Sequence, residues 1–99
     1  MNDARLTLME AIARRQVILA LYNGKEVKLA PHLLFERHGD LFVTALNMSK
    51  AWRSEEDMRL GQFKLAGLGS AELLDESFEP LPSFEPAAPR ADDTVILAV

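Results

Sequence analysis

VILALYNGKEVKLAPHLLFERHGDLFVTALN, which spans residues 17–47, is the stretch that decides the fold. Its three apolar segments are separated only by Asn23-Gly24 and by His38-Gly39-Asp40. Asn-Gly between apolar runs is the strongest short-range hairpin signal, because both central residues of a type I′ turn require positive φ. The stretch therefore predicts an antiparallel meander.

Four strands are expected within this meander. Residues 17–22 are apolar on both alternating faces, which indicates a central strand covered on both sides. Residues 25–31 alternate more cleanly and indicate a half-exposed strand. Pro31 has no N–H to donate to a ladder, so we expect it to mark a bend before the next strand, residues 33–37. Residues 41–46 complete the meander.

A helix is expected before the meander, over residues 7–15. Thr7-Leu8-Met9-Glu10 matches a capping box, in which the threonine and glutamate side chains satisfy free amides of the first turn. Asp3 is a rival cap, which would start the helix one turn earlier and add Leu6 to its apolar face. That face would otherwise consist of Leu8, Met9, Ile12 and Ala13.

The second half of the chain is more irregular. Residues 48–62 form a polar stretch, for which we expect a long excursion with one helical turn. Two short strands are expected at residues 63–65 and 71–74. Five or six antiparallel strands with an N-terminal helix predict a mainly β fold, a small barrel over residues 1–79.

Residues 80–99 have a different composition, a proline-rich acidic tail that ends in six residues of high β propensity. Such an apolar end predicts an added edge strand, in this chain's own sheet or in that of a neighbour. Pairing with a neighbour would make a homo-oligomer through Thr94, Val95, Ile96 and Leu97.

Charge and composition narrow the class of protein. Ninety-nine residues suit one domain, and 48% hydrophobic residues are ordinary for a globular chain. The net charge is −4, with about −6 from Glu72 onward and about +2 before it, and the bases are scattered rather than arranged in a stripe. No run approaches the roughly 20 apolar residues of a membrane span, and the sequence has no cysteine and no secretory signal. We therefore expect a cytoplasmic location without membrane contact.

The order of these features resembles the WYL domain, a module of bacterial transcription regulators. The resemblance is carried by residues 8–12, 17–24, 31, 41–43, 63–68, 73–74 and 78–80. It implies a small SH3-like (Sm-like) barrel. The family's naming tripeptide falls on Leu41, Phe42 and Val43, none of them identical, and its two ligand-holding arginines fall on Lys64 and Gly67.

The resemblance also implies a function, a regulatory or sensor module that binds a small anionic ligand or single-stranded nucleic acid. Lys64 keeps a charge but lacks the planar fork of arginine. Arg53 and Arg59 are candidates to supply the charge missing at Gly67, or they pair with the acids at 55–57. The candidate ligand-binding residues are thus Lys64, Phe42, Arg53, Arg59 and His32.

Catalysis and cofactors have no support in the sequence. There is no cysteine nucleophile, no Gly-x-Ser-x-Gly elbow and no glycine-rich phosphate loop. His32 and His38 lack zinc-site spacing, so we expect neither an enzyme nor a metal or cofactor. The alternative to the ligand-binding module is a protein interaction or oligomer-assembly module that uses the C-terminal strand.

Overall fold

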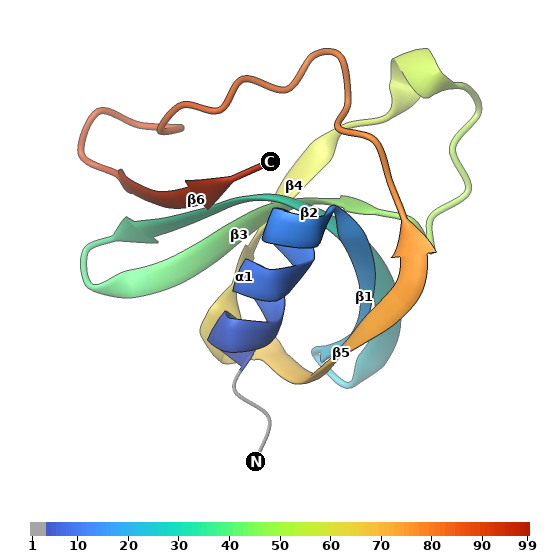
Figure 1. Cartoon of the computed structure of the whole chain (residues 1–99), viewed down its shortest axis with the longest axis horizontal. Helices are drawn as coiled ribbons and strands as arrows, with labels where there is room; N and C mark the ends of the chain where they lie inside the picture. The colour runs from blue at the N-terminus through green and yellow to red at the C-terminus, as the bar shows by residue number, and fades with distance from the viewer. Residues whose placement is uncertain (1–3) are drawn as a thin grey trace.

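Six antiparallel strands and one N-terminal helix make up the fold (Figure 1). The computed structural model describes residues 4–99, except for the side chain of Glu55. Its elements are α1 (Ala4–Arg14), β1 (Gln16–Tyr22), β2 (Lys25–Arg37), β3 (Asp40–Asn47), η1 (Glu55–Asp57), β4 (Leu60–Lys64), η2 (Leu65–Gly67), β5 (Leu68–Ser77) and β6 (Thr94–Ala98), where η is a 3₁₀ turn. The predicted mainly β class with an N-terminal helix is confirmed.

The strands form one open sheet in the order β4-β3-β2-β1-β5. β4 and β5 are the two ends of this order, so the sheet stays open. The two strands are consecutive in the chain and are joined by η2. β2 is long enough to serve two neighbours on one edge, since its first half pairs with β1 and Leu33–Glu36 pair with β6. β3 runs along the other edge of β2.

Both tight turns of the meander lie where the sequence predicted them. Asn23 and Gly24 have φ of 52° and 80°, and His38 and Gly39 have φ of 51° and 82°. Two consecutive positive φ values are the requirement of a type I′ turn, whose twist matches that of the strands it joins. Each turn therefore connects neighbouring antiparallel strands with only two residues.

Pro31 does not separate two strands, as the sequence analysis expected. β2 continues through it, and the ladder to β3 instead shifts register between Pro31 and Leu33. A bulge inserts one unpaired residue and so accommodates a residue that cannot donate. The inserted residue is His32, whose side chain is fully buried.

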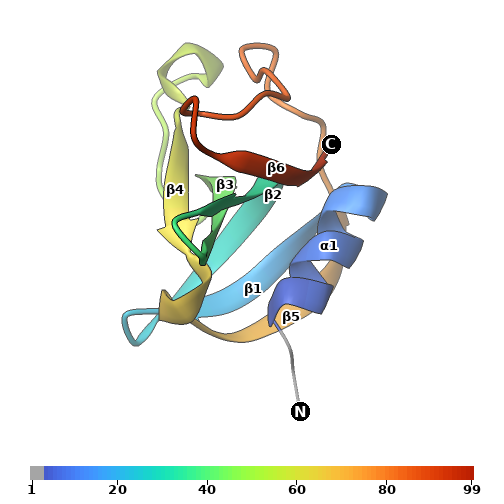
Figure 2. The same cartoon turned by 90° about the vertical axis from the view of Figure 1, so that its left-hand side faces the viewer.

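α1 begins at Ala4, one turn before Thr7, and Asp3 lies outside the described residues. Its buried residues are Leu8, Ala11 and Ile12, spaced to share one face. Leu6 does not join that face, because 61% of its side chain is exposed. Figure 2 shows α1 lying against β1 and β5, on the side away from β4.

One apolar core joins the helix to the sheet. Its buried members are Leu8, Ala11, Ile18, Ala20, Leu29, Val43, Ala45, Leu68 and Ala71. The expected excursion contains η1. β5 extends beyond the strand predicted at 71–74, whereas β4 begins before the strand predicted at 63–65 and ends at Lys64, because Leu65 starts η2. The last strand, β6, adds to its own chain's sheet rather than hanging free.

Candidate functional site

The predicted anion site lies at the end of the β3–β4 ladder. Lys64 is the cross-strand neighbour of Phe42. The Lys64 Nζ lies 3.4 Å from Asp40 Oδ2, and both side chains are about half exposed. A ligand at Lys64 would have to compete with this carboxylate. Because the pair is exposed, it holds the lysine only weakly.

Phe42 does not present a bare ring to a ligand. It stacks on Phe35 with ring centroids 5.5 Å apart and nearly parallel planes. The guanidinium of Arg37 lies 5.1 Å from the Phe35 centroid and 5.2 Å from that of Phe42. Cation–π contacts of this kind stabilise the cation over the rings. The Phe42 ring is therefore already engaged by the buried Phe35 ring and by the Arg37 guanidinium.

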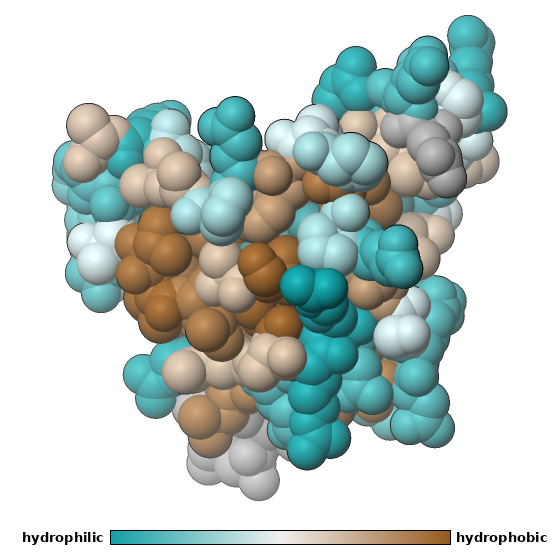
Figure 3. All heavy atoms as spheres, turned by 45° about the horizontal axis from the view of Figure 1, so that its top comes forward, coloured by the Kyte–Doolittle hydropathy of each residue, from teal (hydrophilic) through white to brown (hydrophobic). Residues whose placement is uncertain are grey.

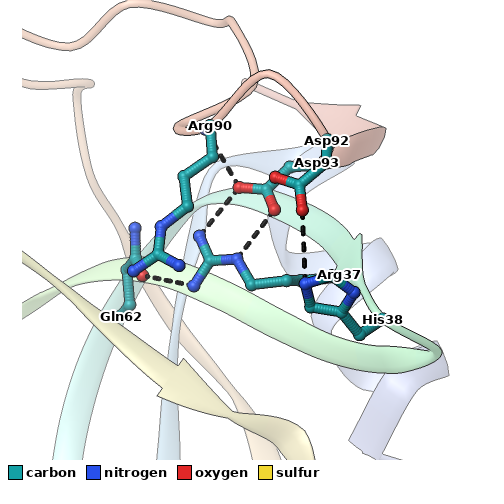
Figure 4. Close-up of polar contacts among 6 residues, drawn as sticks. All are labelled: Arg37, His38, Gln62, Arg90, Asp92 and Asp93. Atoms are coloured by element: carbon teal, nitrogen blue, oxygen red, sulfur yellow. Dashed lines mark hydrogen bonds and ion pairs between the residues drawn. The ribbon is translucent and has the colours of Figure 1, made fainter.

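Arg37 binds Asp93 in a bidentate ion pair, which Figure 4 shows together with its neighbours. Arg37 Nε donates to Asp93 Oδ1 over 2.7 Å, and Arg37 Nη2 donates to Asp93 Oδ2 over 2.8 Å. The Arg90 backbone N–H donates to the same carboxylate over 3.0 Å. The hydrogen bonds from Arg37 lower the pKa of Asp93, and the same bonds raise the pKa of Arg37.

This ion pair was not anticipated from the sequence. Its partners lie 56 residues apart, and the Asp93 side chain is fully buried. A buried carboxylate requires a matched, hydrogen-bonded partner, and a planar guanidinium supplies one. The pair thus fixes the C-terminal segment to β2, and Arg37 has little capacity left for an external anion.

His32 fixes the same segment at a second point. Its Nδ1 lies 2.8 Å from the Ala30 carbonyl oxygen, and the Leu81 N–H donates to its Nε2 over 3.1 Å. This arrangement requires a neutral ring with the proton on Nδ1. Burial lowers the pKa of His32, which favours that neutral form. Phe78 and Phe84 each place a ring centroid 5.1 Å from the imidazole.

The two arginines of the excursion have different surroundings. Arg59 Nη1 donates to the carbonyl oxygens of Glu56, over 2.6 Å, and Met58, over 2.9 Å. Arg59 is also one of the residues that line a cavity. Arg53 is exposed and is not among the residues that line either of the two cavities described next.

The larger cavity has a volume of about 710 Å³ and lies between the excursion and the segment that follows β5. Its wall is mainly apolar and includes five polar or charged residues. The lining residues are Ala30, Leu46, Met48, Glu56, Met58, Arg59, Ser77, Phe78, Glu79, Pro80, Leu81, Pro82 and Ser83. His32 lies behind this wall, because it binds Leu81 and stacks on Phe78.

A smaller cavity of about 340 Å³ lies beside β3 and β4, under residues 83–89. Thr44 contributes to its wall, and the Thr44 hydroxyl is buried without a hydrogen-bond partner. Ser83 lines both cavities, so the segment after β5 separates them.

The five predicted site residues do not form one site. Lys64 and Phe42 are neighbours at one end of the sheet, Arg59 lines the larger cavity, and His32 lies behind its wall. With the side chain of Glu55 left aside, residues 4–99 contain no group of three His, Cys, Asp or Glu that could hold a metal ion. In the same range, no helix has the length and apolar character needed to cross a membrane. Comparisons with protein-family models, curated proteins and solved structures find no match to this chain.

Proposed function

We propose that this chain is a non-enzymatic, WYL-like regulatory module that binds a small molecule in the larger cavity. The observation that carries the proposal is the cavity itself. Its volume of about 710 Å³ falls in the range of small-molecule sites, and its wall is mainly apolar, with five polar or charged residues among thirteen. Met48 and Met58 add flexible side chains that adapt to the shape of a ligand.

The lining residues favour a ligand with an apolar body and a single anionic end. Among the described lining residues, Arg59 is the cation, and its Nη1 is already engaged by two backbone carbonyls. A guanidinium has five N–H donors, so others remain for a carboxylate. Glu56 and Glu79 also line the cavity, and their charges would repel a densely charged anion.

The test is calorimetric titration of the full chain with straight-chain carboxylates such as decanoate. We expect Arg59→Gln to weaken binding about tenfold or more, because a charge-assisted hydrogen bond is lost. Arg53→Gln is the matched control and should bind like the wild type, because Arg53 does not line the cavity.

A second variant tests the cavity independently of charge. Ser77→Trp places a large ring at a lining position that is exposed at the end of β5 and should obstruct entry. Unchanged affinity in both Arg59→Gln and Ser77→Trp would refute the assignment of the ligand to this cavity.

The WYL resemblance supports a second candidate, an anion or single-stranded nucleic acid at Lys64 and Phe42. The observation that favours it is the exposed Lys64 ammonium directly across the ladder from Phe42. Fluorescence anisotropy with labelled single-stranded oligonucleotides tests it. The control is Lys25→Ala, because Lys25 is an exposed lysine at the start of β2. Binding that falls in Lys64→Ala but not in Lys25→Ala would support this site, and equal binding by both variants would exclude it.

A further inference from the structure

β6 exposes two adjacent apolar side chains on the surface of the protein. Val95 and Ile96 are 38% and 41% exposed, although strand neighbours normally point to opposite faces. The ladder to β2 explains this, since Leu34 pairs with Leu97 and Phe35 with Val95, which leaves Ile96 in a bulge. Figure 3 shows an apolar patch on the face of the molecule that carries β6.

Charged side chains on an edge strand normally prevent association with other molecules, but the acids next to β6 face β2 and the β2–β3 turn. Of the two acids before β6, Asp93 is buried and binds Arg37, whereas Asp92 is exposed and its Oδ2 lies 3.2 Å from His38 Nε2. Figure 4 shows both carboxylates facing β2 and the β2–β3 turn. β6 itself contains no charged residue. By contrast, β5, which ends the sheet, carries exposed Glu72, Asp75 and Glu76. Charged residues of that kind guard sheet edges against association.

We propose that this β6 surface, formed by Val95 and Ile96 with their strand, binds a second copy of the same chain across a two-fold axis. A two-fold interface brings one patch against its own copy, so an uncharged apolar patch is automatically complementary to itself. A basic protein partner would need several accessible acids here, and only Asp92 is accessible, because Asp93 is buried against Arg37. An anionic membrane would need basic residues, and residues 91–99 contain none.

The association should be concentration-dependent and favoured by salt. Each copy carries a net charge of −4, so the copies repel one another outside the patch. Added salt screens that repulsion and leaves the apolar contact intact. This inference is independent of the proposed ligand, because neither Val95 nor Ile96 lines the larger cavity.

The test is sedimentation of the full chain from about 1 µM to about 1 mM, a range that covers weak dimers. We expect the mass to rise from 11.0 kDa toward twice that value. Ile96→Lys should weaken dimerisation about tenfold or more, because a charge would be buried in the interface. Leu21→Lys is the matched control, since Leu21 is also 41% exposed but lies in β1, which pairs on both edges. It should dimerise like the wild type.

Three results would overturn the proposal. The first is a wild-type mass of 11.0 kDa at every concentration. The second is equal dimerisation of the folded Ile96→Lys and Leu21→Lys variants. The third is binding of the monomer to phosphatidylserine-containing vesicles that Ile96→Lys abolishes, because the surface would then bind membranes. If circular dichroism shows that Ile96→Lys is unfolded, the near-isosteric Val95→Thr replaces it, and unchanged dimerisation of that variant counts against the proposal.

Discussion

His32→Phe removes two hydrogen bonds while keeping an aromatic ring at the bulge of β2. The lost bonds are those with the Ala30 carbonyl and the Leu81 N–H, at 2.8 Å and 3.1 Å. The ring contacts with Phe78 and Phe84 have a replacement, because a phenyl ring is close to imidazole in shape. At about 1 kcal/mol for each hydrogen bond, the free energy of unfolding should fall by about 2 kcal/mol. For a domain of this size, that corresponds to a decrease of roughly 8–16 °C in Tm.

The pH dependence supplies the sharper part of this prediction. Burial lowers the pKa of His32 from its ordinary value of 6.5. As the pH falls below 6.5, the unfolded chain takes up this proton before the folded protein does. Stability linked to His32 is therefore fully present above that pH and is lost below it, by at most about 1.4 kcal/mol per pH unit. His32→Phe has no such group, so its deficit relative to the wild type should shrink in acid.

Urea and thermal denaturation of both proteins, followed by circular dichroism at about pH 7.5 and about pH 5, measure the two free energies. His38 is present in both proteins, so its contribution to the difference cancels. A deficit that is equal at the two pH values would refute the neutral, hydrogen-bonded state assigned to His32.

Three further substitutions test other parts of the structure. Asp93→Asn should speed the amide hydrogen exchange of β6 and proteolysis before Thr94, because Arg37 loses its buried carboxylate partner. Asp92→Asn is the control and should change neither rate, because Asp92 lies in an exposed pair. Leu29→Ala should lower the free energy of unfolding by about 2–5 kcal/mol in urea denaturation, because Leu29 is fully buried in the core. Gly24→Ala should cost about 1 kcal/mol by the same measurement, because an added Cβ meets no atom within 4 Å and the penalty comes from φ of 80° alone.

Local signals account for the part of the fold that the sequence predicts. Asn23-Gly24 determines its turn because the conformational preference lies in those two residues. The bulge at His32 is different, since Pro31 allows either a break or a bulge and the pairing with β3 decides between them. The partner of residues 94–99 is equally undetermined, because β propensity indicates a strand and not its neighbour.

The sequence was less informative about the site, because each polar residue selects its partner in three dimensions. Nothing near Arg37 in the chain indicates that it binds Asp93, and nothing near His32 indicates a bond from Leu81. Arg53 and Arg59 look equivalent in sequence, yet the fold directs only Arg59 toward the larger cavity. The resemblance could point to Lys64 but could not show that Asp40 pairs with it.

The division of one β2 edge between β1 and β6 has a consequence for a chain that is cut between β5 and β6. After such a cut, β6 would be held only by its ladder to β2 and by the Arg37–Asp93 pair. If β6 then dissociated, the backbone of Leu33–Glu36 would become an empty acceptor groove, with β3 still paired on its far side. In that state the molecule could take up an extended segment from a different polypeptide, as donor-strand exchange does in other β proteins. β6 thus covers a strand-binding edge of β2, and its loss would allow β2 to pair with a strand from another polypeptide.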